Sequence, residues 1–67
     1  MSNFRARLFE EHSELGHKIE KLKKFIVSGE CARLPEIDRV DLSEQLEHME
    51  NYYSVLSNRV SRQCNNA

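Results

Sequence analysis

The sequence predicts an all-α fold, an antiparallel helical hairpin with helices at residues 3–27 and 36–62 that assembles into a homo-oligomeric bundle. Three observations lead to this prediction. Apolar residues recur at helical spacing in both halves of the chain, a short segment containing the only proline separates the halves, and 67 residues bury a small core at best. We expect one domain, residues 1–67, in which residues 63–67 form a frayed tail.

The first helix is predicted from apolar or near-apolar side chains that recur every three or four residues. This stripe consists of Phe4, Leu8, His12, Leu15, Ile19, Leu22 and Ile26. Gly29 follows it, where a residue in the left-handed backbone conformation would cap the helix. If Leu8 takes the d position of a seven-residue repeat, Phe4 and Phe25 fall on the g flank of the stripe and Phe9 on the e flank.

The second helix is predicted from a similar stripe, which consists of Leu42, Leu46, Met49, Tyr53, Leu56 and Val60. Two start signals compete, because Asp41 and Glu44 resemble a capping box, whereas Pro35 suits the first position of an earlier helix. We place the start at residue 36. Tyr52 widens this stripe, and a lone hairpin could not bury so many aromatic side chains. The pattern therefore predicts several hairpins together, as a dimeric four-helix bundle or a larger assembly.

The charge is small overall but unevenly distributed. Residues 1–29 contain six basic and four acidic residues, and residues 30–67 contain four basic and seven acidic residues, giving balances of +2 and −3. A net charge of −1 argues against DNA or general nucleic-acid binding, and the asymmetry suits halves that attract each other or a local anion site. The two cysteines form no disulfide framework, and no segment resembles a signal peptide or a membrane span. We therefore expect a cytoplasmic protein without membrane contact.

The sequence offers no arrangement of residues that suits catalysis. It has no glycine-rich phosphate loop and no nucleophile with a neighbouring base. His12 and His17 are five residues apart and project from different faces of a helix, and His48 has no ligand at metal-binding spacing. We expect no enzyme activity, no metal and no cofactor, and we interpret His12 as a packed or interface histidine.

The four lysines between residues 18 and 24 do not have one role. Lys23 and Lys24 fit a solvated face, where Glu–Lys pairs four residues apart stabilise a helix. Lys18 instead flanks the apolar stripe, so it approaches a neighbouring chain and suits an anion pocket, while Lys21 stays undecided. Gly16 costs about 1 kcal/mol relative to alanine inside a helix. Close approach of a partner would explain it, and so would simple tolerance.

In the N-terminal segment Phe4 is followed closely by Arg5 and Arg7. An aromatic ring with nearby guanidinium groups can stack on a nucleobase while an arginine pairs with a phosphate. Phe4 also suits a hydrophobic anchor at an interface. Arg59, on the g flank of the second helix, suits an interface ion pair in the absence of a ligand.

Residues spread over 4–60 resemble a family of small phage proteins, the anti-CBASS sponges that sequester cyclic oligonucleotide second messengers. The resemblance rests on an N-terminal aromatic residue followed by Arg7, Glu11, Leu15, Lys18, Ile19, Leu22, Phe25, Ile26, Gln45, Leu46, Met49, Tyr53, Leu56 and Arg59. It implies a helical hairpin that assembles into a homohexamer in the cytoplasm of the host bacterium. It also implies binding of cyclic dinucleotides, such as cyclic GMP–AMP, between protomers.

The same resemblance implies which residues bind. A family lysine that pairs with phosphate corresponds to Lys18, and a stacking aromatic residue, typically tyrosine, corresponds to Phe4. Arg59 corresponds to an arginine that contributes to separate pockets for cyclic trinucleotides in some members. Arg7 and Lys21 complete the predicted nucleotide-binding set.

Two other functions remain open at this point. A plain helical bundle that binds a host protein or a structured RNA would show the same periodicity. An enzyme that hydrolyses the messenger fits least well, since the residues for hydrolysis are missing.

Overall fold

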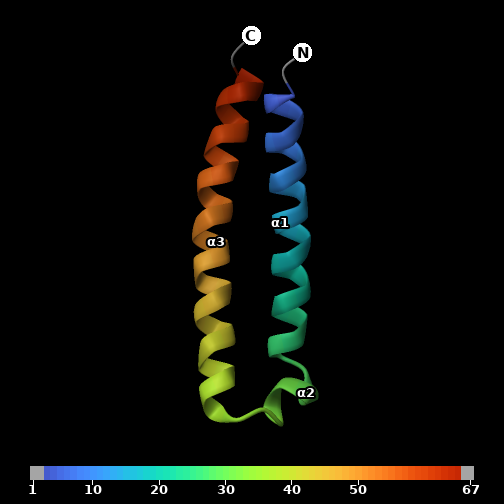
Figure 1. The fold of residues 1–67 in the computed structure, drawn as a ribbon, viewed down its shortest axis with the longest axis vertical. Coiled ribbons are helices and arrows are strands. Elements are labelled where there is room, and N and C mark those ends of the chain that lie inside the picture. The colour runs from blue at the N-terminus through green and yellow to red at the C-terminus, as the bar shows by residue number, and fades with distance from the viewer. Residues whose placement is uncertain (1–2, 66–67) are drawn as a thin grey trace.

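The computed structural model describes residues 3–65, and over these residues its regular structure is entirely helical. Helix α1 (Phe4–Ile26) and helix α3 (Glu36–Asn65) lie side by side and antiparallel, and the short helix α2 (Gly29–Ala32) lies in the connection between them (Figure 1). The hairpin measures 49 × 17 × 16 Å, with both chain ends at the same end of the rod. The predicted all-α hairpin is confirmed.

Helix α3 is longer than predicted, whereas α1 matches its prediction closely. Helix α1 agrees within one residue at each end, whereas α3 continues to Asn65, three residues beyond its predicted end at residue 62. The guanidinium of Arg5 donates a hydrogen bond of 2.8 Å to the backbone carbonyl of Gln63, which fastens the last turn of α3 to the start of α1. Residues 66–67 of the predicted tail lie outside the described residues.

The end of α1 is shaped by Ser28 rather than by Gly29. Neither glycine has a positive φ, so the prediction of a left-handed cap is wrong. The Ser28 hydroxyl donates a hydrogen bond of 2.6 Å to the carbonyl of Phe25 and accepts one of 3.3 Å from the backbone N–H of Cys31. Ser28 thus joins the end of α1 to the start of α2, and Cys31 is buried there, only 3% exposed.

Helix α3 begins at the earlier of its two predicted starts. The carbonyl of Pro35 accepts hydrogen bonds from the N–H groups of Asp38, at 3.0 Å, and Arg39, at 3.2 Å. Pro35 therefore stands immediately before the first helical residue, where its missing N–H costs nothing. Asp41 and Glu44 lie inside the helix, so the residues that resemble a capping box do not cap it.

The core is a single layer of side chains between α1 and α3. Leu8, Leu15 and Ile19 from α1 are buried against Leu56 of α3, which is fully buried. Partly buried Leu46, Met49, Tyr53 and Val60 complete it. This agrees with the predicted stripes. Large apolar side chains at least one-third exposed are Phe4, Phe9, Phe25, Val27, Ile37, Val40, Tyr52 and Val55. No helix within residues 3–65 is long and apolar enough to cross a bilayer.

Gly16 allows the ring of Tyr53 to lie directly against α1. A Cβ atom at residue 16 would lie 3.2 Å from Cε1 of Tyr53. The same ring stacks on His12 with a centroid distance of 4.4 Å and an interplanar angle of 18°. His12 Nε2 also shares a hydrogen bond of 2.9 Å with the Ser57 hydroxyl. The close approach considered for Gly16 therefore occurs within one chain, from α3.

Substituting Gly16→Val is expected to destabilise the protein, because the added atoms overlap the space of the stacked Tyr53 ring. We expect a loss of about 1–3 kcal/mol of unfolding free energy, the usual cost of overpacking. Urea denaturation at fixed protein concentration measures it, with the exposed His17→Val as the matched control. A Gly16→Val protein as stable as the control would contradict this explanation.

Candidate functional site

The hairpin has two long faces that are chemically different. We define the Phe4 face by two rows of residues, one on each long helix, in which residues recur every seven positions. The α1 row consists of Phe4, Glu11, Lys18 and Phe25, and the α3 row consists of Gln45, Tyr52 and Arg59. We define the Gly16 face by Gly16 and Lys23 of α1 with Glu50 and Ser57 of α3. Contacts between Phe4 and Arg59 on one side, and between Lys23 and Glu50 on the other, fix these assignments.

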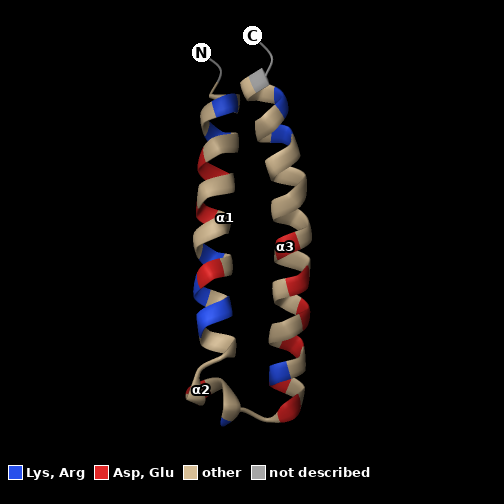
Figure 2. Ribbon diagram, turned by 180° about the vertical axis from the view of Figure 1, so that it is seen from behind, with Lys and Arg blue, Asp and Glu red and all other residues tan. Residues whose placement is uncertain are grey.

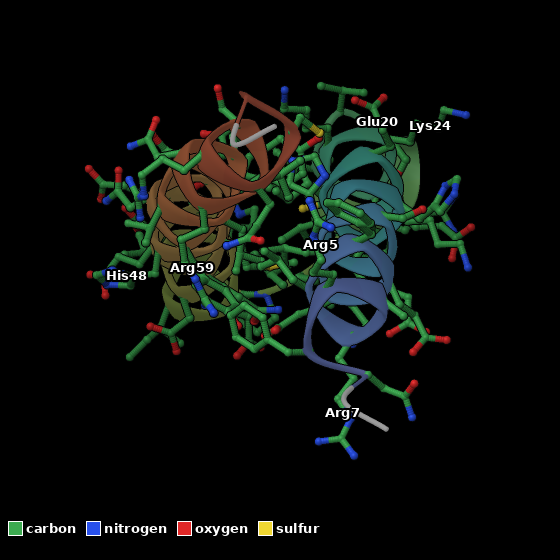
Figure 3. The ribbon with its side chains drawn as sticks, turned by 90° about the horizontal axis from the view of Figure 1, so that it is seen from above. Arg5, Arg7, Glu20, Lys24, His48 and Arg59 are labelled. Atoms are coloured by element: carbon green, nitrogen blue, oxygen red, sulfur yellow. The ribbon has the colours of Figure 1, made fainter. Side chains whose placement is uncertain are left out.

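Phe4 and Arg59 come together on the Phe4 face, although they are far apart in sequence. The Arg59 guanidinium carbon lies 5.8 Å from the centroid of the Phe4 ring, within the range of a cation–π interaction. The Phe4 side chain is 50% exposed. In the end-on view Arg59 extends from α3 towards α1, whereas Arg7 projects away from α3 (Figure 3). Of the two arginines that follow Phe4, Arg5 contacts α3, through its hydrogen bond to the Gln63 carbonyl.

Lys18 and Lys21 are both exposed and lie well away from Phe4. Lys18 is fourteen residues after Phe4, which is about 21 Å along a helix at 1.5 Å per residue. One chain therefore cannot place Phe4 and Lys18 against the same point of a small ligand. The structure brings together Phe4 and Arg59 from the predicted set, but not Arg7, Lys18 or Lys21.

Lys23 differs from its prediction in having a partner on the neighbouring helix. Its Nζ atom lies 3.3 Å from Oε2 of Glu50, and both side chains are about half exposed. Lys24 lies on the outer side of α1 beside Glu20, as expected of a solvated face (Figure 3). Lys23 therefore links the two helices.

Charge is divided between the helices near the α2 end of the hairpin. Figure 2 shows the basic part of α1 alongside the acidic first half of α3. The Lys23–Glu50 pair joins these two regions. The uneven charge of the sequence thus contributes attraction within the hairpin. Within the described part of the chain, no three His, Cys, Asp or Glu side chains lie close enough to hold a metal ion.

Two hollows on the surface lie away from the predicted residues. One, on the Gly16 face, is lined by His12, Ser13, Gly16, His17, Ile19, Glu20, Lys23, Glu50 and Tyr53. The other follows the first half of α3 and is lined by Glu36, Arg39, Val40, Ser43, Glu44, Leu46, Glu47 and Glu50. The second hollow holds four carboxylates and a single guanidinium, so its field opposes a phosphate. Neither hollow includes any of the five predicted nucleotide-binding residues.

Sequence reasoning did not assign Tyr52 to the site. Its ring is 45% exposed and belongs to the same α3 row as Arg59, seven residues before it. That spacing was the available signal, since residues seven apart share one flank of a packed helix. Tyr52 gives the Phe4 face another aromatic surface, and Phe25, 36% exposed, gives it a third.

The comparison with known families gives one match. The family model described as Sequestin matches residues 2–62, most of the chain. No curated protein and no solved structure matches the sequence. The matched region includes both long stripes and every residue on which the resemblance to cyclic-oligonucleotide sponges rests, and the family's name fits that resemblance.

The Phe4–Arg59 contact is expected to contribute measurable coupling between the helices. In a double-mutant cycle of Phe4→Leu and Arg59→Gln, we expect a coupling of about 0.5–1 kcal/mol, the size of an exposed cation–π interaction. Urea denaturation of the four proteins measures it. Arg62→Gln, an exposed arginine one turn further along α3, replaces Arg59→Gln in the control cycle. Strictly additive effects in the first cycle would show that the contact contributes nothing.

Proposed function

Since the chain belongs to the Sequestin family, we propose that it binds and sequesters cyclic di- and trinucleotide second messengers, such as cyclic GMP–AMP, and releases them uncleaved. In this proposal it is a phage-type immune-evasion protein that acts in the host bacterial cytoplasm. There it lowers the concentration of free messenger that would activate an effector in anti-phage signalling. It acts as a homo-oligomer, a hexamer by resemblance to the anti-CBASS sponges.

The observation that supports this proposal most directly is the contact between Phe4 and Arg59. It combines a half-exposed aromatic ring with a guanidinium group 5.8 Å from the ring centroid. A cyclic dinucleotide consists of flat bases joined by phosphates, and aromatic rings stack on bases while guanidinium groups pair with phosphates. These chemical groups therefore match the ligand class.

The separation of Phe4 and Lys18 supports a site made by more than one chain. Within one chain they are about 21 Å apart along α1, and both are exposed. A symmetric interface would supply Phe4 from one chain and Lys18 from another, and would repeat both groups around a ligand that is itself nearly symmetric. Arg7 and Lys21 add positive charge at the rim of such a site.

Sequestration requires tight binding of the messenger and enough of the binding protein, but it requires no reaction of the messenger. A binding protein lowers free messenger by mass action when its dissociation constant is below the concentration that activates the effector. The proposal therefore assigns no residue to bond cleavage. It also requires no metal and no cofactor.

The alternative function is a helical module that binds another protein. The acidic hollow along α3, with Glu36, Glu44, Glu47 and Glu50, favours a partner with a basic surface. The same carboxylates disfavour the structured-RNA version of this alternative. Recovery of a stoichiometric basic host protein, with no binding of cyclic nucleotides, would support this alternative.

We expect calorimetry against a panel of cyclic di- and trinucleotides to detect saturable binding, and Lys18→Ala to weaken it at least tenfold. The reason is that loss of the ammonium group removes a charge-assisted contact to phosphate, worth about 1.5–3 kcal/mol. Lys24→Ala, which removes the same charge from the outer side of α1, serves as the control and should bind like the native protein.

Absence of saturable binding to every member of the panel would overturn the proposal. Equal affinities for Lys18→Ala and Lys24→Ala would leave the function standing but remove Lys18 from the site. Nucleotide recovered after heat denaturation of the complex should be intact. Recovery of a linear product would instead identify a hydrolase.

A further inference from the structure

The α1 row of the Phe4 face has a self-complementary order. Its residues are Phe4, Glu11, Lys18 and Phe25, at intervals of seven. Positions 4 and 25 share a midpoint with positions 11 and 18, between residues 14 and 15. When two copies of the row lie antiparallel, each aromatic residue therefore faces an aromatic residue of the other copy. Each charged residue faces a residue of opposite charge.

We propose that a second copy of the chain docks on this row with its α1 antiparallel, about a two-fold axis that passes between residues 14 and 15. Glu11 then lies against the partner's Lys18, and Lys18 against the partner's Glu11. Phe4 lies against the partner's Phe25, and Phe25 against the partner's Phe4. Two ion pairs are thereby flanked by two aromatic pairs along about 31 Å of helix.

The exposure of these side chains in the single hairpin supports a covering partner. Phe4 is 50% exposed and Phe25 is 36% exposed, while Glu11 and Lys18 are both exposed. Aromatic pairs contribute beyond their burial, and a row repeating every seven residues follows the shallow supercoil of helical bundles. Tyr52 of α3 lies at the level of Glu11, because the Phe4–Arg59 contact and the common seven-residue spacing set that register.

The charges of the row favour a second copy of the chain as the partner, and they favour an antiparallel orientation of its α1. In a parallel pair in the same register, Glu11 would face Glu11 and Lys18 would face Lys18, which costs free energy through like-charge repulsion. The antiparallel pair replaces both repulsions with attractions. A two-fold interface needs this self-complementarity, since the same surface serves both partners.

The pairing also explains how Phe4 and Lys18 act on one ligand in the proposed function. The partner's Phe4 lies beside Phe25, seven residues from Lys18, which is about 10 Å along the helix instead of about 21 Å within one chain. A phosphate at Lys18 would compete there with the partner's Glu11. The inference rests on the self-association in the proposed function, but not on its ligand.

Charge exchange tests the pairing by sedimentation equilibrium without nucleotide. We expect Glu11→Lys and Lys18→Glu each to raise the dissociation constant of self-association at least tenfold, because each change places like charges together twice. The double variant E11K/K18E restores both attractions and is expected to return within about threefold of the native value. Glu10→Lys and Lys24→Glu make the same charge changes on the outer side of α1 and should associate normally. Helical circular dichroism identifies any variant that fails to fold, and a conservative pair, Glu11→Gln and Lys18→Gln, then replaces it with smaller effects expected.

Single variants that associate like their controls would overturn the pairing, and so would a double variant no better than the weaker single variant. A native chain that is monomeric at every concentration would overturn it as well. These failures are distinct from failure of the proposed function, because calorimetry of the native protein with cyclic nucleotides tests ligand binding separately.

Discussion

Two helices packed against each other can bury only one side of each, and this geometric limit governs the whole molecule. In the hairpin, four side chains from α1 and α3 form the buried part of the core, with Leu56 fully enclosed. On the flanks of the stripes a lone pair of helices covers aromatic side chains only partly, and those at least 36% exposed are Phe4, Phe9, Phe25 and Tyr52. A small core of this kind contributes little stability, and we propose that association and ligand binding use the exposed flanks.

The two flanks use their residues differently. On the Gly16 face Tyr53 lies against Gly16 and His12, and Lys23 pairs with Glu50. Phe9, in the same α1 row as Gly16, stays 40% exposed. On the Phe4 face, aromatic rings and charges remain exposed, apart from the Phe4–Arg59 contact. The contacts within the chain therefore belong mainly to the first face, and we propose that nucleotide binding and self-association use the second. Both assignments for the Phe4 face follow from the same row of α1.

Periodicity was sufficient to predict the two long helices and the core between them, because a helix buries every third or fourth residue whatever its partner. It was not sufficient at the helix ends. The hydroxyl of Ser28 determines how α1 ends, and Arg5 holds the last turn of α3 through Gln63. Such contacts depend on which residues meet after folding, so a pattern within one helix does not reveal them.

The pattern within each helix was also insufficient to predict how residues of the candidate site meet across the two helices. The resemblance assigned Phe4 and Arg59 to different kinds of pocket, but the register between α1 and α3 places them in contact. The reason for Gly16 likewise became visible only once Tyr53 was placed opposite it. Lys18 was predicted to contact phosphate from its flank position and from the resemblance, and the structure adds its distance from Phe4.

We propose that the nucleotide site exists only where chains meet. Native mass spectrometry over a dilution series, with a cyclic dinucleotide present, can decide this, because it reports the ligand carried by each assembly. We expect nucleotide on assemblies of two or more chains and none on the monomers that appear on dilution. Monomers that carry the nucleotide in the same proportion per chain as the assemblies would contradict it.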